Sequence, residues 1–223
     1  VHDTTLLNLI NKLNNDILVN GILIQLPIPE HLNKNVLFNA IDYNKDVDGF
    51  HITNIGSIAS NNREPLFVPC TALACMKILE YEKIELKGKN TVVIGKSDIV
   101  GLPISLLLLK KMATVTVCHI DTNKQSLLDY CKNADIIISA CGQPEMIKKH
   151  WLKSGVCIID IGINTIEDNT KKNGYRIVGD IDYNDVIDTV SKITPVPGGV
   201  GPMTIAMLIY NTFLAYKLQH NIS

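Results

Sequence analysis

The chain has 223 residues, a net charge of −1 and an apolar fraction of 46%. This length suffices for one large domain or two small ones. A net charge near zero argues against nucleic acid or an anionic membrane surface as the main partner, and no apolar run approaches the ~20 residues of a membrane span. The six cysteines form no CxxC pair, which indicates reduced core residues in a reducing compartment, and no His, Cys or Asp spacing resembles a metal site.

Residues 1–69 are expected to form part of a small α/β domain. Thr4 or Thr5 is placed to cap a helix whose apolar residues share one face. The apolar run 21–26 stops at Pro27 and predicts a buried strand. A short helix at 36–41 and an acidic loop at 46–50 follow. Because the chain opens at Val1 and directly in helical periodicity, we expect it to be a piece of a longer protein.

Strands and helices alternate regularly beyond Gly88. We expect helices at 101–112 and 124–132 and strands at 91–94, 114–118, 134–140, 156–161, 176–178 and 191–193. Such alternation predicts a parallel sheet covered on both faces, so the fold class is α/β. We assign residues 70–202 to a Rossmann-type domain. The final helix, 205–218 within the segment 203–223, is expected to return to the N-terminal part.

A glycine-containing turn at 95–101 follows the first of these strands and opens a helix. Such a turn offers free amides and a helix N-terminus to a phosphate, although Ser97 replaces the middle glycine of the usual G-x-G-x-x-G. The alternation downstream favours a dinucleotide site over a plain connection. At the tip of the next strand, Asp121 suits a ribose 2′-hydroxyl, whereas Lys96 suits a 2′-phosphate. These residues leave open whether the cofactor is NAD or NADP. They also leave open whether Asp121 is only a solvent-exposed acid of the loop.

The segment 195–204, Pro-Val-Pro-Gly-Gly-Val-Gly-Pro-Met-Thr, is the most informative run in the chain. Proline fixes the backbone path, and glycine lets the main chain approach a flat ligand closely. Thr204 is expected to cap the final helix. A turn-rich connection without a ligand would have the same composition. The motifs elsewhere in the chain are what favour a ligand-binding loop.

Six motifs occur in the order and spacing of one family. They lie at 21–27, 45–50, 95–103, 160–164, 178–180 and 195–204. With them the chain resembles the bifunctional methylenetetrahydrofolate dehydrogenase/methenyltetrahydrofolate cyclohydrolase family, the FolD type. The resemblance implies a two-domain enzyme that binds tetrahydrofolate derivatives and is usually a homodimer built through its nucleotide-binding domain.

The resemblance also implies roles for particular residues. Asp48 matches the aspartate that hydrogen-bonds the pterin ring, and Gln25 matches a glutamine beside the catalytic lysine; a structural role as a loop acid fits Asp46 better than Asp48, and Gln25 could equally be a polar strand end. Both are therefore candidate catalytic residues. The loop against which the pterin lies is matched by Pro197, Gly198 and Gly201. The positions that line the cofactor are matched by Thr71, Gly95, Ser97, Ile163 and Thr204, to which we add Lys96.

The chain departs from the family pattern at three places. The family's Tyr-x-x-x-Lys stretch, which holds the catalytic lysine, lies upstream of Val1, so we expect these 223 residues alone to lack cyclohydrolase turnover and to expose an apolar patch in their N-terminal part. Ile120 replaces a serine or arginine near the 2′-phosphate, and Ala72 replaces a proline. On the family default we favour NADP as the cofactor, with NAD as the alternative.

The family's activity is the oxidation of 5,10-methylenetetrahydrofolate and the hydrolysis of the product to 10-formyltetrahydrofolate. We expect this activity for the natural protein, in one-carbon metabolism and purine biosynthesis, in the cytoplasm or else in mitochondria. Two alternatives remain: a dehydrogenase for another substrate or without cyclohydrolase activity, and a nucleotide- or folate-binding fragment without catalysis. Binding of tetrahydrofolate analogues would separate the first from the family reading, and the natural N-terminal sequence would test the second.

Overall fold

A computed structural model describes residues 2–60 and 62–222 of the chain. Its backbone contacts divide the chain into two compact units: unit 1, Val1–Cys70 with Ile205–Ser223, and unit 2, Thr71–Thr204. The chain passes between the units at the start of helix α4 (Cys70–Tyr81) and inside helix α8 (Val200–Gln219). None of the described helices combines the length and the apolar character that a membrane crossing needs.

Unit 2 is built on a five-stranded parallel sheet with the strand order β2-β1-β3-β4-β7. The strands are β1 (Asn90–Ile94), β2 (Thr114–Cys118), β3 (Ile136–Ser139), β4 (Cys157–Asp160) and β7 (Lys192–Ile193). Every residue of β3 and β4 is buried, as expected for strands covered on both faces. Because β2 and β3 lie on opposite sides of β1, the strand order reverses between β1 and β3, where doubly wound sheets bind ligands.

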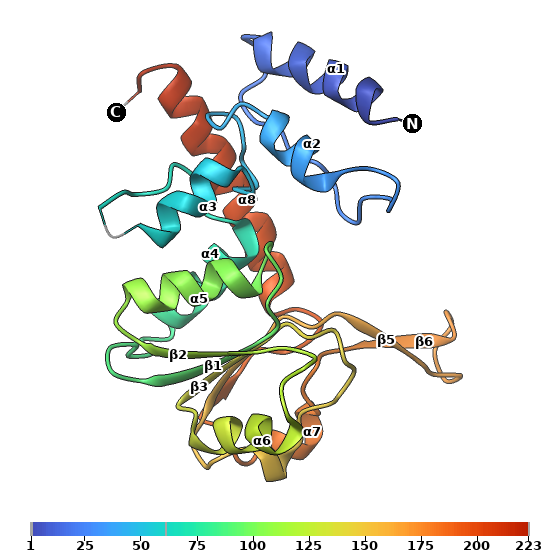
Figure 1. The fold of residues 1–223 in the computed structure, drawn as a ribbon. Coiled ribbons are helices and arrows are strands. Elements are labelled where there is room, and N and C mark those ends of the chain that lie inside the picture. Colours follow the sequence, from blue (N-terminus) through green and yellow to red (C-terminus); the bar gives the residue numbers. More distant parts are fainter. Residues whose placement is uncertain (1, 61, 223) are drawn as a thin grey trace. The chain divides into compact units, whose positions relative to one another are not determined.

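Helices cover both faces of this sheet. Figure 1 places α4 and α5 (Gly101–Lys110) on one face, and α6 (Lys124–Asn133) and α7 (Tyr183–Val186) on the other. The second face includes the short 3₁₀ helix Lys149–Trp151, whose tryptophan belongs to the same buried apolar cluster as residues of β1, α6 and α7. A two-stranded antiparallel ribbon, β5 (Asn164–Glu167) with β6 (Tyr175–Val178), projects from the sheet (Figure 1).

Unit 1 contains three short helices, α1 (Asp3–Asn15), α2 (Lys34–Ala40) and α3 (Ile52–Ala59), and the C-terminal part of α8. Its apolar side chains form two small clusters, one around Ile10 and Leu37 and one around Phe67 and Ala215. The buried ammonium of Lys45 donates to the carbonyls of Leu13, Asn14 and Asp16 at 2.7–3.2 Å, so it caps the C-terminal end of α1.

The expected α/β class and the parallel sheet are confirmed, and most predicted elements lie within a few residues of their observed bounds. The strand expected at 21–26 is wrong: only Ile22 makes a bridge, to Asp46, because no strand among the described residues runs beside the rest of the segment. The strand expected at 176–178 exists but belongs to the ribbon; its exposed residues set it apart from the buried sheet strands.

Two predicted helix caps are also wrong. Helix α1 starts earlier than expected, with His2 as the N-cap, so Thr4 and Thr5 lie inside it. Helix α8 starts at Val200, because Gly201 and Pro202 are tolerated in a first turn that leaves its amides without helical acceptors. Thr204 therefore lies within the helix, and its hydroxyl donates to the carbonyl of Val200 at 3.1 Å.

Candidate functional site

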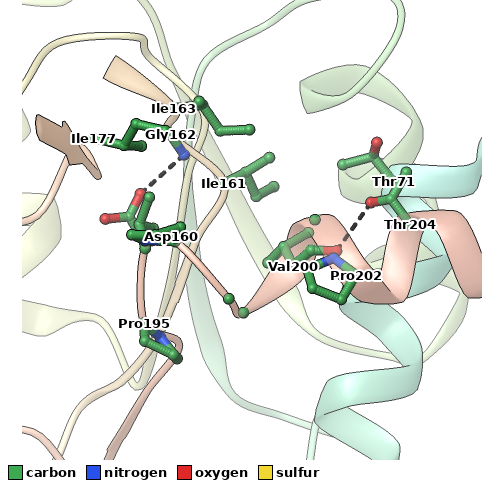
Figure 2. Close-up of a pocket in the computed structure, with 15 residues that line it drawn as sticks. Thr71, Asp160, Ile161, Gly162, Ile163, Ile177, Pro195, Val200, Pro202 and Thr204 are labelled. Carbon is green, nitrogen blue, oxygen red and sulfur yellow. Dashed lines mark hydrogen bonds between the residues drawn. The ribbon is translucent and has the colours of Figure 1, made fainter. Parts of the chain in front are cut away.

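A pocket of about 440 Å³ lies in unit 2 at the carboxyl end of β4 (Figure 2). Its wall is formed by the loop that follows β4, by the proline- and glycine-rich segment 195–202 and by the start of α8. The structure brings six predicted site residues together there: Thr71, Ile163, Pro197, Gly198, Gly201 and Thr204. Figure 2 draws Thr71 and Thr204 at one end of the pocket and Ile163 near Ile161. The proline- and glycine-rich segment thus contributes most of the residues that line the pocket, and the two edge strands of the sheet, β2 and β7, contribute little.

Asp160 and Asp180 fix the loops around this pocket. The carboxylate of Asp160 accepts hydrogen bonds from the backbone N–H groups of Gly162, Asp180 and Ile181 at 2.9–3.1 Å. Asp160 therefore ties the end of β4 to the segment that follows β6. Burial is the main cause that raises the pKa of Asp160 to about 6, and these N–H donors oppose the shift.

Asp180 ties the same segment to the loop that follows β3. It is fully buried, and it accepts hydrogen bonds from the Ser139 hydroxyl, from the Asn164 side chain and from the amides of residues 141–143 at 2.8–3.3 Å. A Cβ on Gly162 would lie 2.3 Å from the Asp180 carboxylate, and a Cβ on Gly179 would lie 1.9 Å from the Asp160 carboxylate. The two aspartates thus require the two glycines, and the four residues pack together at the pocket wall, which Asp160 and Gly162 line.

The predicted phosphate-binding turn lies at the reversal point of the sheet. Gly95 has φ +122°, and a Cβ there would lie 2.3 Å from the Ala140 carbonyl oxygen; a Cβ on Gly101 would lie 1.9 Å from that of Gly95. Glycine at both positions lets α5 start close against β1. Within the described chain, the backbone N–H groups of residues 96–99 have no hydrogen-bond acceptor. This turn therefore offers what the pyrophosphate of a dinucleotide needs, and Lys96 and Ser97 are exposed on it.

The tip of β2 is held by local hydrogen bonds. The amide of His119 donates to the Thr122 hydroxyl at 2.9 Å, and the amide of Asp121 donates to Nδ1 of His119 at 3.3 Å. The side chain of Asp121 is 82% exposed and lies 3.6 Å from His119 Nδ1. Ile120 is 91% exposed, so an apolar side chain points to solvent where the sequence places the adenosine ribose.

Asp48 lies in unit 1, in a loop organised by its neighbour Asp46. The buried Asp46 carboxylate accepts hydrogen bonds from the amides of Gly49, Phe50 and His51 and from the side chain of Asn54 at 2.8–3.2 Å. Asp46 is therefore the structural acid of the loop, as the sequence suggested. Asp48 is half-buried and takes no part in that network. Its pKa is raised to about 6, mainly by burial and further by the charge of Asp46, while a hydrogen bond from Cys70 opposes the shift.

Gln25, the other candidate in unit 1, is exposed. Its side-chain amide donates only to the carbonyl of Leu26, at 3.1 Å, so no side chain among the described residues holds it. Four residues hold the loops that contain predicted site residues, and the sequence predicted a role for none of them. They are Asp160 and Asp180 in unit 2, and Cys70 and Asn211 in unit 1. The sequence carries a signal for the two aspartates. Asp160 stands two residues before Gly162, which packs on Asp180, and Asp180 directly follows Gly179, which packs on Asp160.

The residues present fit a dinucleotide. The free amides of residues 96–99 and the exposed side chains of Lys96 and Ser97 can hold the pyrophosphate, and the pocket walls are largely apolar, as a flat ring requires. No three His, Cys, Asp or Glu side chains gather to hold a metal ion in residues 2–60 and 62–222.

The sequence matches two family models. Residues 69–220 match the NAD(P)-binding domain of tetrahydrofolate dehydrogenase/cyclohydrolase, and residues 1–48 match the catalytic domain of the same enzymes. The chain is 50% identical over 212 residues to the bifunctional protein FolD 2 of Arabidopsis thaliana, covering 95% of this chain and 70% of that protein. It is 49% identical to the mitochondrial C-1-tetrahydrofolate synthase of Saccharomyces cerevisiae, where 98% of this chain spans 22% of the relative.

A solved structure shares the fold. The Trypanosoma brucei methylenetetrahydrofolate dehydrogenase-cyclohydrolase, crystallised with NADP and an inhibitor, superposes with a TM-score of 0.93 at 39% identity, covering 98% of this chain and 73% of that one. The sequence and the fold that carry the pocket, the phosphate-binding turn and the acidic loop thus match the same family of enzymes. The chain belongs to the tetrahydrofolate dehydrogenase/cyclohydrolase family.

Proposed function

We propose that the protein containing this chain oxidises 5,10-methylenetetrahydrofolate to the methenyl compound and hydrolyses that product to 10-formyltetrahydrofolate, in one-carbon metabolism. The observation that carries the proposal is the 440 Å³ pocket, whose walls combine three predicted cofactor residues with three predicted pterin residues. Family membership supports both activities. We assign residues 1–69 with 203–223 to the folate domain and 70–202 to the nucleotide domain.

A bound nicotinamide cofactor would supply the hydride acceptor that oxidation of the bridging methylene to a cationic methenyl group requires. The chain's contribution to this step is orientation. The turn at 95–101 holds the pyrophosphate through its free amides, and Thr71, Ile163 and Thr204 line the nicotinamide position. The backbone of Pro197, Gly198 and Gly201 presents a surface without bulky side chains to a flat ring, which favours one approach of the reacting carbon.

The Asp48 carboxylate recognises the pterin. An ionised carboxylate accepts two parallel hydrogen bonds, one from a ring N–H and one from an exocyclic amine. In the hydrolytic step water adds to the methenyl carbon, one carbon–nitrogen bond breaks and a proton is released. Gln25 has an exposed amide that can hold a lysine side chain without protonating it, and its neutral amide keeps that amine available for proton transfer.

We favour NADP over NAD, with the exposed ammonium of Lys96 as the contact to the 2′-phosphate. Asp121 supports this choice, because its side chain is 82% exposed and no hydrogen bond among the described residues holds it at the ribose position. We further propose a homodimer built through unit 2. The projecting ribbon supports this arrangement, since Tyr175 and Ile177 on it are exposed.

The compartment we propose is a reducing one, the cytoplasm or the mitochondrion. All six cysteines are free, and burial raises the pKa of the thiols of Cys118 and Cys131, which makes both unreactive. In such a compartment 10-formyltetrahydrofolate is available to purine biosynthesis, the pathway expected from the sequence.

Substitution of Asp48 tests the proposed function. For Asp48→Ala in the natural protein we expect folate affinity to fall about a hundredfold, since a lost charge-assisted pair costs about 2–3 kcal/mol. The dissociation constant for NADP should not change. Asp48→Asn, which keeps one acceptor but no charge, should give an intermediate folate affinity. Unchanged folate affinity in Asp48→Ala would contradict the assignment.

A further inference from the structure

One buried amide on helix α8 joins the two segments that carry Asp48 and Cys70. Asn211 is 1% exposed. Its side-chain nitrogen donates to the carbonyls of Val47, at 2.9 Å, and Val68, at 3.1 Å, and lies 3.6 Å from the sulfur of Cys70. All of these residues belong to unit 1. A buried asparagine side chain is costly unless its donors are satisfied, and these carbonyls satisfy them.

We propose that Asn211 is a positioning residue that sets the direction of the Asp48 carboxylate. This inference rests on the proposed function, in which Asp48 binds the pterin. The carbonyl of Val47 and the amide of Asp48 belong to one planar peptide unit. Fixing the Val47 oxygen therefore fixes the orientation of the bond that leads into Asp48. Asn211 acts through that peptide and contacts no reacting atom.

The same peptide unit is held from a second side. The thiol of Cys70 lies 3.3 Å from the Val47 carbonyl oxygen and also within reach of the Asp48 carboxylate, so its single hydrogen is shared between these two acceptors. Behind the loop, Gly49 packs on the backbone of Val68 and Pro69 so closely that a Cβ would lie 2.6 Å from the Pro69 nitrogen. The loop therefore cannot relax backward, and its position depends on the donors in front of it.

An amide is the side chain that this arrangement requires. Asparagine offers two N–H hydrogens to two carbonyl oxygens at one end of a short side chain. Aspartate has the same shape but only acceptor atoms when ionised, so it would place a charge against the two carbonyls. The nature of residue 211 therefore separates hydrogen-bond donation from packing.

The test compares Asn211→Ala and Asn211→Asp with Thr212→Val in the full chain. Thr212 is exposed, and its hydroxyl donates only within α8, to Leu208 at 2.8 Å, so it is a matched control. Calorimetric titration with tetrahydrofolate and with NADP gives both dissociation constants, and dehydrogenase assays of the natural protein give KM and kcat.

We expect Asn211→Ala to raise the folate dissociation constant and KM about tenfold, with NADP binding unchanged. Asn211→Asp should weaken folate binding at least as much, and Thr212→Val should leave it unchanged. Wild-type folate affinity in both Asn211 variants, or an equal loss of NADP affinity, would overturn the inference.

A second pair of variants covers the case in which the Asn211 variants do not fold. Cys70→Ser keeps a donor for the Val47 carbonyl and should retain most of the folate affinity, whereas Cys70→Ala should lose a few-fold. Equal affinities in these two variants would count against positioning through the Val47 carbonyl. If the wild-type chain binds NADP but no folate, both the proposed function and this inference fail. If the wild-type chain binds folate and the variants bind it equally well, this inference fails and the proposed function stands.

Discussion

The two units hold their predicted site residues by different means. In unit 2 the loops around the pocket follow strands of a buried sheet, and Asp160 and Asp180 attach them to each other. In unit 1 none of the described residues forms a sheet behind Asp48; the loop is held by the buried side chains of Asp46, Asn54 and Asn211. The comparison teaches that a buried sheet and two buried carboxylates together hold the pocket loops of unit 2, whereas polar side chains without a sheet hold the Asp48 loop of unit 1.

The units also differ in how completely they bury apolar residues. Ile205, Ile209 and Phe213 follow one another at helical spacing on α8, and each is about three-fifths exposed, at 59–65%. These three residues give the part of α8 that belongs to unit 1 an exposed apolar face. In unit 2 the side chains of β3 and β4 are buried on both faces. Unit 2 thus has the more complete core of the two.

The largest effect should come from removing Asp180. This carboxylate accepts five hydrogen bonds from buried or half-buried groups, so Asp180→Ala leaves several donors without acceptors. We expect a loss of about 3 kcal/mol or more in the free energy of unfolding, measured by urea titration. Asp129→Ala removes an exposed acid on α6 and should change it by less than about 0.5 kcal/mol. Equal stabilities of the two variants would show that the hydrogen bonds to Asp180 do not stabilise unit 2.

The sequence alone predicts most of unit 2 and much less of unit 1. Periodicity locates β1, α5, β2 and α6 because short β-branched runs mark the strands of a covered parallel sheet and helical spacing of apolar residues marks the helices between them. It fails for the run 21–26, whose apolar residues have no neighbouring strand, and for α3, which a histidine caps and an aspartate supports from outside the helix. The position of Asn211 against Val47 joins residues 164 apart, and no local pattern predicts such a contact.

The candidate site was predictable to the extent that it consists of motifs. Glycine and proline in the segment 195–204 mark the pocket wall, because their backbone effects are local. The nearby glycines gave a signal for Asp160, but its hydrogen bonds from the amides of Asp180 and Ile181 join residues 20 and 21 apart, and no local pattern predicts such contacts. The interpretation of Asp46 as the structural acid beside Asp48 is confirmed by its four hydrogen bonds.

A pH titration separates folate binding from stability at Asp48. Burial raises the pKa of this carboxyl from 3.8 to about 6. Between these values the folded chain binds a proton that the unfolded chain releases, so the contribution of Asp48 to stability rises as the pH falls from about 6 to about 4. Folate affinity should move in the opposite direction, because only the ionised carboxylate accepts both pterin hydrogen bonds. We expect a loss approaching tenfold per pH unit below about 6.

The control for this titration is Asp48→Asn, which cannot ionise. Its weaker folate affinity should vary less with pH, and the difference in unfolding free energy between wild type and variant isolates Asp48 from Asp160, whose pKa is also about 6. Affinity of the wild type that stays constant down to pH 5 would show that the neutral carboxyl serves equally well.

The smallest expected effect concerns the choice of cofactor in unit 2. Lys96 is exposed, so its contact with a 2′-phosphate is screened by solvent, and Lys96→Ala should weaken NADP binding only about threefold to tenfold. NAD lacks this phosphate, so its dissociation constant should not change, and rising ionic strength should reduce the difference between wild type and variant. Asp121→Asn is the matched test of the other reading: if Asp121 instead binds the ribose 2′-hydroxyl, this variant loses NAD affinity while Lys96→Ala changes neither cofactor. A clear preference of the wild-type protein for NAD would assign the ribose contact to Asp121. Among the described residues of the turn, the free amides of residues 96–99 would then be the only phosphate ligands.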